Sequence, residues 1–294
     1  MTGRVQRRDR ATGPTSPPRW KKVIGIIGGL GPHAHLEFER LLLVATERLL
    51  GRAARDQDYP PWIVSSLPST PDRTTALLSG GPSPLDALEL SARRLMGGED
   101  SLGADFAVIP CNTAHAFLEA LRQRIALPIL DMVRETAQEA ERLLGGAGTV
   151  GILATTGTLE SGLYSAALKS AGSKLCVLSP LDLLEGKELQ EKLVMEPIYG
   201  PMLESPGGVE RAGGGIKSGT FHDSREAERL VEPLRHAVKL LAKAGADLVI
   251  TACTEIPLAL GRKPIEGIPL LDPLDVAARA SVDIAIGRRA ARLD

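Results

Sequence analysis

The sequence is short of aromatic residues, of cysteines and of net charge. Only 3% of its 294 residues are Phe, Trp or Tyr, which leaves few side chains that can stack on nucleic-acid bases. The formal net charge of −1 provides no general attraction to nucleic acid or to an anionic membrane. No apolar run reaches the roughly 18 residues that a membrane-spanning helix needs. We therefore expect neither a nucleic-acid partner nor a membrane partner.

The cysteine count also limits the class of protein. Three cysteines in 294 residues do not make a disulfide framework, so we expect free thiols in a reducing, cytoplasmic setting. Residues 1–20 are rich in Arg, Pro, Ser and Gly and lack the apolar segment of a secretion signal. We expect a disordered basic tail there, with a targeting or partner-binding arm as the alternative.

Two segments with the same pattern organise the rest of the chain. In each, an apolar run typical of a buried strand leads to a cysteine and then to small polar residues: residues 106–109 precede Cys111, and residues 248–250 precede Cys253. In open α/β sheets, ligands bind at the carboxyl ends of the strands. Each cysteine is therefore expected at a ligand site, although a structural role for each thiol is the alternative.

Further landmarks recur in the same order along the chain. Residues 150–158 have the shape of residues 24–31, and residues 268–272 repeat residues 127–131. Strands alternate with helices throughout, which is typical of parallel βαβ units. The sequence therefore predicts two pseudo-symmetric α/β domains, each with a doubly wound and mostly parallel sheet, and an active site in the cleft between them.

The expected first domain comprises residues 21–132 plus 257–294, because the last helix, from residue 274, is expected to pack back on the first half. The expected second domain comprises residues 133–256. It contains a Gly- and Pro-rich insertion at residues 201–215, where that composition favours neither a helix nor a strand. A flexible lid is the alternative for this insertion.

The first strand ends in a glycine-rich turn at residues 28–32. The turn lacks the third glycine and the later acidic residue of a dinucleotide-binding motif. We expect the backbone around Gly29 and Leu30 to approach a small anion instead, with a purely structural turn as the alternative. Arg73 lies in a rigid loop after the next strand, and its guanidinium is suited to binding a carboxylate through two hydrogen bonds.

Two thiols on opposite faces of one carbon atom can invert it. One thiolate removes a proton, the other thiol returns a proton from the opposite side, and the roles exchange in the reverse direction. Hydroxyl donors and helix N-termini beside each sulfur are expected to raise its thiolate fraction. Donors to the substrate carboxylate would stabilise the carbanion, and the candidates for this role are Asn112, Thr113, Thr155 and Thr254.

Other interpretations of these residues stay open. His115 follows Cys111 by four residues, as in a Cys/His hydrolase, but without an evident third partner we expect it to pack against or cap its helix. His33 and His35 are more typical of an exposed helix surface than of a metal site, and Cys176 of a small buried hydrophobe. No pattern requires a cofactor, and a non-catalytic amino-acid-binding protein is a further hypothesis.

Several motifs, taken in order, resemble those of the aspartate/glutamate racemase family, and specifically its aspartate racemase branch. They lie at residues 28–32, 71–74, 110–115, 153–158, 216–219 and 253–257. The resemblance covers the chain from about residue 23 to its end.

This resemblance implies a cofactor-independent racemase that acts on a small acidic amino acid. Cys111 would act on the D-enantiomer and Cys253 on the L-enantiomer, while Arg73 and Lys217 match positions that bind the side-chain carboxylate. Glu255 stands where glutamate-specific members typically have His, so the expected substrate is aspartate. Family members are commonly dimers, and we expect a homodimer. The expected substrate-binding residues are Gly29, Leu30, Arg73, Asn112, Thr113, Thr155, Lys217, Thr254 and Glu255.

Some positions depart from the family pattern. Leu30 stands where the family often has Met, and His33 and His35 also differ from it. The insertion at residues 201–215 lies beside Lys217, where it bears on substrate choice. The alternative function is other chemistry of the same superfamily: a glutamate or hydantoin racemase, a diacid isomerase or a decarboxylase.

Overall fold

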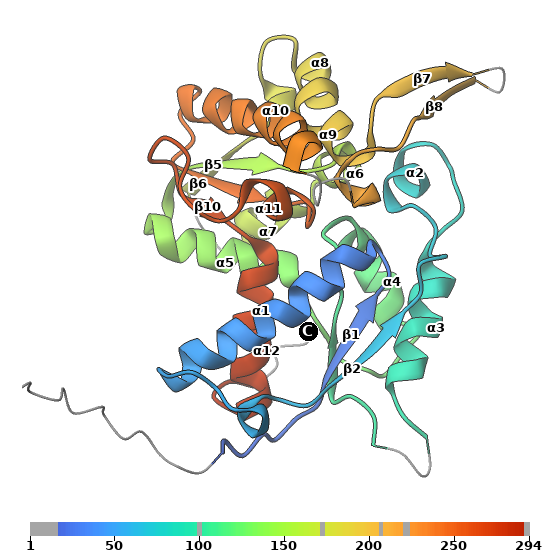
Figure 1. Cartoon of the computed structure of the whole chain (residues 1–294), viewed down its shortest axis with the longest axis vertical. Helices are drawn as coiled ribbons and strands as arrows, with labels where there is room; N and C mark the ends of the chain where they lie inside the picture. Colours follow the sequence, from blue (N-terminus) through green and yellow to red (C-terminus); the bar gives the residue numbers. More distant parts are fainter. Residues whose placement is uncertain (1–16, 99–101, 171–173, 206–207, 220–223, 291–294) are drawn as a thin grey trace, which may run out of the picture.

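The computed structural model describes residues 17–98, 102–170, 174–205, 208–219 and 224–290. They form two α/β lobes, one above the other in Figure 1, each built on a four-stranded sheet. All strand pairs within these two sheets are parallel. The predicted fold class is therefore confirmed.

The first lobe has the strand order β2-β1-β3-β4. Alternate side chains enter two cores, as the two-residue period of a strand requires. Ile24 and Phe106 pack with α1 and α12, whereas Ile27 and Ala107 pack with α3 and α4. The elements of this lobe are β1 (Ile24–Gly28), α1 (Pro32–Leu50), η1 (Asp56–Asp58), β2 (Trp62–Ser66), α2 (Arg73–Leu78), α3 (Leu85–Leu95), β3 (Phe106–Val108), η2 (Thr113–Phe117), α4 (Leu118–Arg122) and β4 (Ile129–Leu130).

The second lobe has the strand order β10-β9-β5-β6. Ile152 packs with α5 and α7 on one face of the sheet, and Leu153 packs with α10 and α11 on the other. The elements from α5 onward are α5 (Met132–Leu144), β5 (Ala147–Leu153), α6 (Thr156–Glu160), α7 (Leu163–Ser170), β6 (Lys174–Leu178), η3 (Pro180–Asp182), α8 (Gly186–Gln190), the π-helix η4 (Glu191–Met195), α9 (Glu196–Tyr199), β7 (Met202–Ser205), β8 (Gly208–Arg211), η5 (Ile216–Ser218), α10 (Ser224–Lys243), β9 (Leu248–Thr251), α11 (Ile256–Leu260), β10 (Leu270–Leu271) and α12 (Pro273–Ile286).

Helix α12 connects the lobes. It starts directly after β10 and packs along α1, where Leu274 and Ala277 share a core with Phe38. Residues 257–271, which we expected in the first domain, lie instead with the second lobe. There β10 pairs with β9 and Ile265 packs on the core under α10. The expected boundary at residue 257 came too early because β10 completes the second sheet as β4 completes the first.

The prediction that residues 201–215 hold no strand is wrong. Strands β7 and β8 pair antiparallel and project from the second lobe beyond α2 in Figure 1. Glycine and proline are concentrated outside the strands, so residues 202–205 contain neither and can extend. The segment is a β-hairpin, which we call the 201–215 hairpin.

Trp20, the last residue of the predicted tail at residues 1–20, is part of the fold. Trp20 packs on the core of the first lobe, and its indole nitrogen donates a hydrogen bond to the carbonyl of Asp58 at 3.2 Å. The rest of this prediction, up to residue 16, lies outside the described residues. In the described part of the chain no helix is both long and apolar enough to cross a membrane.

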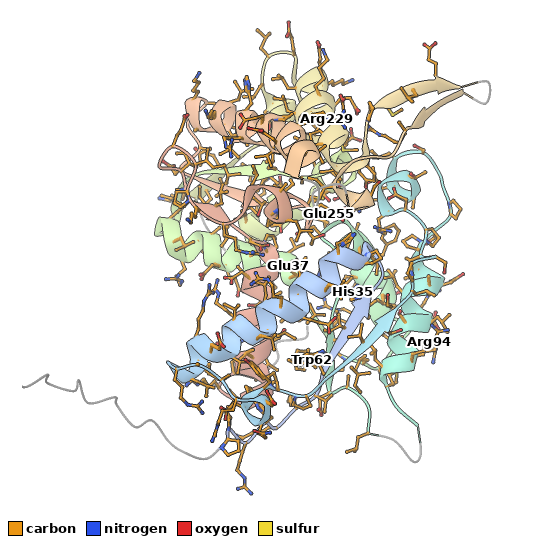
Figure 2. The ribbon with its side chains drawn as sticks, in the orientation of Figure 1. His35, Glu37, Trp62, Arg94, Arg229 and Glu255 are labelled. Carbon is orange, nitrogen blue, oxygen red and sulfur yellow. The ribbon has the colours of Figure 1, made fainter. Side chains whose placement is uncertain are left out.

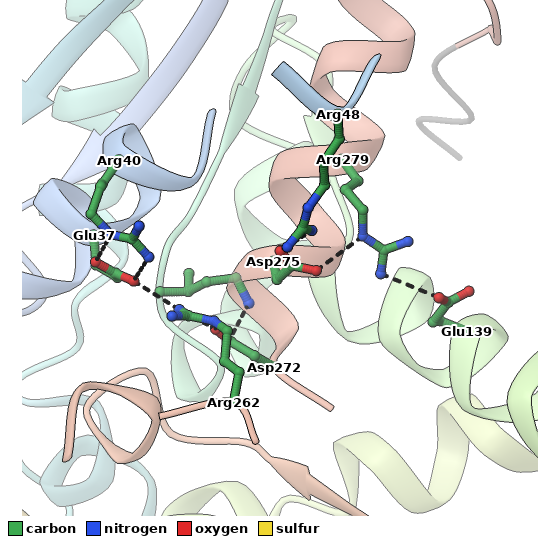
Figure 3. A network of polar contacts seen from close by, with 9 residues as sticks. Glu37, Arg40, Arg48, Glu139, Arg262, Asp272, Asp275 and Arg279 are labelled. Atoms are coloured by element: carbon green, nitrogen blue, oxygen red, sulfur yellow. Dashed lines mark hydrogen bonds and ion pairs between the residues drawn. The ribbon is translucent and has the colours of Figure 1, made fainter. Parts of the chain in front are cut away.

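A network of ion pairs lies at the junction of the lobes (Figure 3). Arg262, from the segment before β10, contacts Glu37 of α1 at 2.8 Å and donates to Asp272, the N-cap residue of α12, at 2.7 Å. Arg48 of α1 contacts Asp275 of α12, also at 2.8 Å. Through Arg262 these contacts tie the segment before β10 in the second lobe to α1 of the first.

Candidate active site

One small pocket contains both repeated cysteines. Its free volume of about 10 Å³ is room for roughly one water molecule. The described residues that line it are Arg73, Cys111, Asn112, Thr113, Thr155, Tyr199, Lys217, Cys253, Thr254 and Glu255. All of the predicted site residues are therefore brought together except Gly29 and Leu30. A larger cavity of about 220 Å³ lies beside α6 and α7, but none of the described residues that line it is a Cys, Lys, Arg or His.

Cys111 is held by its backbone. It follows β3, and its carbonyl accepts a hydrogen bond from the ring of His115 at 2.9 Å. The other ring nitrogen of His115, Nε2, accepts from the backbone amide of Met132 at 3.2 Å, so Nδ1 carries the proton. Both ring nitrogens are thus engaged with the backbone. This arrangement gives His115 the packing role expected of it and leaves no base for a Cys/His hydrolase.

Arg73 reaches the pocket from the first residue of α2. Its guanidinium donates to the carbonyls of Leu30 at 2.5 Å and of Pro71 at 3.1 Å, which aim it, while its buried Nε has no partner among the described residues. Burial by itself would lower the pKa of Arg73, but its electrostatic interactions with Cys111 and then with Asp72 raise it overall. Arg73 is therefore a permanently charged donor beside Cys111.

Asn112 and three threonines supply neutral donors. The side-chain oxygen of Asn112 accepts from the hydroxyl of Tyr164 at 2.6 Å, whereas its buried Nδ2 has no partner among the described residues. The Thr113 hydroxyl, from the first lobe, lies 3.2 Å from that of Thr155 and 2.8 Å from that of Thr158 in the second lobe. A buried amide without a partner is costly. Its presence in a pocket wall indicates a polar ligand.

Cys253 shares a carboxylate with a lysine. Its thiol donates to Glu255 Oε2 at 3.1 Å, Thr254 donates to the same oxygen at 3.0 Å, and Lys217 lies 3.0 Å from Oε1. Figure 2 shows Glu255 where the two lobes meet.

The charges in this group of residues shift one another's pKa values. Burial raises the pKa of Cys253, and the Glu255 carboxylate raises it further. Burial alone would raise the pKa of Glu255, but Lys217 lowers it below its ordinary value. The expectation that the surroundings of each sulfur raise its thiolate fraction is therefore wrong for Cys253. The reason is that Glu255, two residues after Cys253, is a carboxylate that accepts a hydrogen bond from the thiol.

The glycine turn lies behind the pocket wall. A Cβ atom on Gly29 would lie 2.5 Å from the backbone of Leu67, so only glycine permits this close approach, and the backbone there has φ +89°. The Gly29 amide donates to Nδ1 of His35 at 3.3 Å. His35 is buried, contrary to our expectation, because it caps this turn. Leu30 contributes its carbonyl to Arg73 rather than a side chain to the pocket.

The sequence analysis missed Tyr199, which lines the pocket from the end of α9. Burial raises the pKa of Tyr199, so its phenol stays protonated. The available signal was its position: it directly precedes Gly200 and the insertion, in a chain with only three tyrosines. Cys176, expected to be buried, is exposed. Leu175 and Val177 pack on the core, so the alternation of a strand turns Cys176 away from it.

The described residues contain no group of three or more His, Cys, Asp or Glu side chains that could hold a metal ion. What the structure defines is a pair of similar parallel α/β lobes with one thiol from each in the wall of a shared pocket. This combination is matched by a family model: residues 27–195, more than half of the chain, match the one described as Asp/Glu/Hydantoin racemase. The chain belongs to this racemase family.

Individual relatives agree with this assignment. The chain is 26% identical over 265 residues to the broad specificity amino-acid racemase RacX of Bacillus subtilis, covering 88% of this chain and 96% of the relative. It is 30% identical over 213 residues to the glutamate racemase of Desulforudis audaxviator, covering 70% and 66%. Among solved structures, Picrophilus torridus aspartate racemase superposes with a TM-score of 0.66 at 24% identity, covering 93% of this chain and 96% of that one, which shows the shared fold.

Proposed function

We propose that this protein is a cofactor-independent racemase that inverts the α-carbon of aspartate with Cys111 and Cys253 as the two bases. The observation that carries the proposal is that equivalent thiols of two similar lobes line one pocket together with two cations, Arg73 and Lys217. The family membership and the racemase names of its relatives support the reaction class.

The charges next to the two sulfurs assign their starting roles. The guanidinium of Arg73 lies beside Cys111, whereas the Cys253 thiol donates a hydrogen bond to the Glu255 carboxylate. From these contacts we assign Cys111 as the base that begins the reaction and Cys253, whose thiol is hydrogen-bonded to a carboxylate, as the acid. The Cys111 thiolate takes the Cα proton of one enantiomer, and the electron pair of that bond moves into the α-carboxylate as an enediolate. Cys253 then donates its proton to the opposite face of Cα.

After this step Cys111 is a thiol and Cys253 a thiolate. That form accepts the opposite enantiomer and runs the same steps in reverse, which returns the starting form. The enediolate needs donors at the α-carboxylate, and the unpartnered Nδ2 of Asn112 and the hydroxyls of Thr113 and Thr155 are placed in the same wall. A single donor of this kind contributes on the order of 3 kcal/mol to the stability of a transition state.

The cations favour a diacid substrate. Arg73 is buried and Lys217 is half-buried beside the pocket, and Glu255 neutralises only one of these two cations. A second carboxylate on the substrate would satisfy the unpartnered Nε of Arg73 and share Lys217 with Glu255. Because the free volume is close to that of one water molecule, the pocket has to widen before any amino acid binds. Glu255, at the position where glutamate-specific members typically have His, supports aspartate over the longer diacid.

A direct test is incubation of the pure protein with L-aspartate in deuterium oxide. We expect D-aspartate that carries deuterium at Cα, detected by chiral chromatography and mass spectrometry. The same incubation with all acidic and amide amino acids would identify the substrate range. The matched control is Cys176→Ser, which keeps both pocket thiols, run beside Cys111→Ala and Cys253→Ala. Absence of exchange at every acidic amino acid would reject the proposal.

Glutamate is the second candidate substrate, because a relative that is 30% identical is a glutamate racemase. The incubation described above distinguishes glutamate from aspartate by the ratio of their racemisation rates. A non-catalytic binding protein makes a different prediction: aspartate would raise the melting temperature of Cys111→Ser and Cys253→Ser as much as that of the parent, and the parent would show no turnover.

A further inference from the structure

Tyr199 is the largest side chain in the pocket wall and the single aromatic one among the described residues that line it. Its ring centroid lies 5.2 Å from the ammonium of Lys217. Its hydroxyl lies 3.4 Å from that of Thr74 and 3.5 Å from the carboxylate of Asp72, the residues on either side of Arg73. Tyr199 therefore extends from one pocket cation to the neighbourhood of the other, across the boundary between the lobes.

The 201–215 hairpin contacts Tyr199 through a residue that does not line the pocket. The guanidinium of Arg211, the last residue of β8, lies 5.8 Å from the centroid of the same ring. Arg211 is fixed in turn by an ion pair with Glu191, in which Nη2 donates at 2.8 Å, and by a hydrogen bond to the carbonyl of Gly200 at 3.1 Å. The ring therefore lies within cation–π distance of both an arginine of the hairpin and the lysine of the pocket.

The base of the hairpin leaves little freedom for this arrangement. A Cβ atom on Gly200 would lie 1.8 Å from the carbonyl oxygen of Gly213, and one on Gly215 would lie 2.5 Å from that of Ile198. The backbones on the two sides of the insertion thus touch, and Ile216, which follows, is fully buried. Tyr199 and Lys217 come from opposite ends of the insertion and are held together by its closed base.

From this arrangement we infer that Tyr199 is a specificity-determining residue that limits the pocket to a four-carbon diacid, and that Arg211 of the hairpin is the positioning residue that keeps it there. The inference rests on the proposed function for its site but not on the thiol chemistry. A fifth carbon would push the distal carboxylate toward Arg73 and Lys217. Tyr199 extends from Lys217 to the residues beside Arg73, and the pocket that it lines has a free volume of only about 10 Å³.

The test compares substrates and dicarboxylates that differ by one methylene. In Tyr199→Leu we expect the kcat/KM ratio of glutamate to aspartate to rise about tenfold or more over the parent, as one methylene in a pocket allows. Titration calorimetry with succinate and glutarate should show the same shift of preference without any need for turnover. Tyr199→Phe keeps the ring and should keep the parent's preference. Tyr59→Leu, a tyrosine outside the pocket, is the matched control.

Arg211 gives the second variant, which serves if Tyr199→Leu does not fold. Arg211→Gln should shift the same ratio in the same direction by less, mainly through KM, and Arg211→Lys should restore it because a cation again faces the ring. Arg235→Gln, which removes another ion-paired arginine of this lobe, should leave the ratio unchanged.

A glutarate-to-succinate affinity ratio that is the same in the parent, in Tyr199→Leu and in Arg211→Gln would overturn the inference. If the ratio is unchanged because both affinities fall by the same factor, the role of these residues is structural. Failure of the racemase proposal appears separately, as a parent that binds succinate but exchanges no Cα proton.

Discussion

The two lobes have equivalent scaffolds but place different charges next to their thiols. Strand order β2-β1-β3-β4 in the first corresponds to β6-β5-β9-β10 in the second, and each lobe delivers a cysteine just after its third strand in that order. Cys111 lies beside the cation of Arg73, whereas Cys253 donates to the anion of Glu255. Duplication of the fold thus provides two thiols in one pocket, and the neighbouring charges make them unequal, as a reaction with one acid and one base requires.

The lobes also differ at the outer end of the pocket. The second lobe carries the 201–215 hairpin, whose Arg211 faces Tyr199, while α2 of the first lobe brings Arg73 from the opposite side. The shared elements therefore hold the chemical groups, and the unshared hairpin supports the wall that we propose selects the substrate.

The strongest way to test the comparison is to remove each thiol in turn. Cys111→Ser and Cys253→Ser should each lower racemisation at least about 1000-fold, because neither direction then has both an acid and a base. Each variant should still exchange the Cα proton of one enantiomer, and the enantiomer should differ between the two. Deuterium incorporation into D- and L-aspartate measures this. Loss of exchange from the same enantiomer in both variants would contradict inequivalent bases.

Glu255→Gln should remove the negative charge next to Cys253 and so make the surroundings of the two thiols more alike. The carboxylate raises the pKa of Cys253, so its removal lowers that pKa and allows the thiol to ionise at lower pH. The limb of the kcat/KM profile that reports Cys253 should move to lower pH in both directions of racemisation. The rate should fall about tenfold or more, because Lys217 loses its partner. Profiles that coincide with those of the parent would show that Glu255 does not control Cys253. Glu188→Gln, at an exposed ion pair, is the control.

The helix caps at the ends of β4 and β10 provide a test of stability. Asp131 caps α5 and Asp272 caps α12, but Asp272 is buried, and burial raises its pKa from 3.8 to about 6 despite Arg262. The folded state thus binds this proton more tightly than the unfolded state. Its contribution is present below about pH 3.8 and is lost as the pH rises through about 6, by an amount on the order of 3 kcal/mol.

Asp272→Asn keeps a capping side chain and removes this titration. Between pH 4 and pH 7 its free energy of unfolding, measured in urea, should fall less steeply with pH than that of the parent. Asp131→Asn serves as the control for loss of a cap carboxylate. Equal slopes in the parent and in Asp272→Asn would contradict the shift.

The smallest effect is expected at the third cysteine. Cys176 is exposed, so Cys176→Ser should change the free energy of unfolding by less than about 0.5 kcal/mol and leave kcat/KM unchanged. In the folded parent a thiol reagent should label Cys176 quickly and the two buried cysteines slowly. Fast labelling of Cys111 or Cys253 would show that the pocket is more open than described.

Much of the fold was predictable because it is written in local patterns. Buried strands read as apolar runs, and the repeated order of strand, cysteine and polar cap gave the two-lobe architecture and the pair of thiols. The first domain was expected to end at residue 132, which is the first residue of α5. It was expected to resume at residue 257, which lies within α11 of the second lobe. The likeness of residues 268–272 to residues 127–131 was the local signal that places β10 at the equivalent edge of the second sheet, and the expected restart at residue 257 did not take it into account.

The residues that sequence analysis missed or misjudged depend on neighbours distant in the chain. Tyr199 lines the pocket only because α9 meets the loop that carries Arg73, about half the chain away. His35 is buried because the turn at Gly29 folds back on it. The hairpin was misjudged because the composition of the whole insertion concealed two short strands without glycine or proline in their interiors.

By itself the sequence determined the parallel α/β class, the internal repeat and the residue types at the pocket, because hydrophobic period and motif spacing are local properties of the chain. Only the tertiary structure decided which charge stands beside which sulfur, how closely the lobes confine the pocket, and that a tyrosine at the foot of the hairpin is part of its wall. Coulomb energies, burial and free volume depend on distances through space, and the order of residues along the chain does not specify those distances.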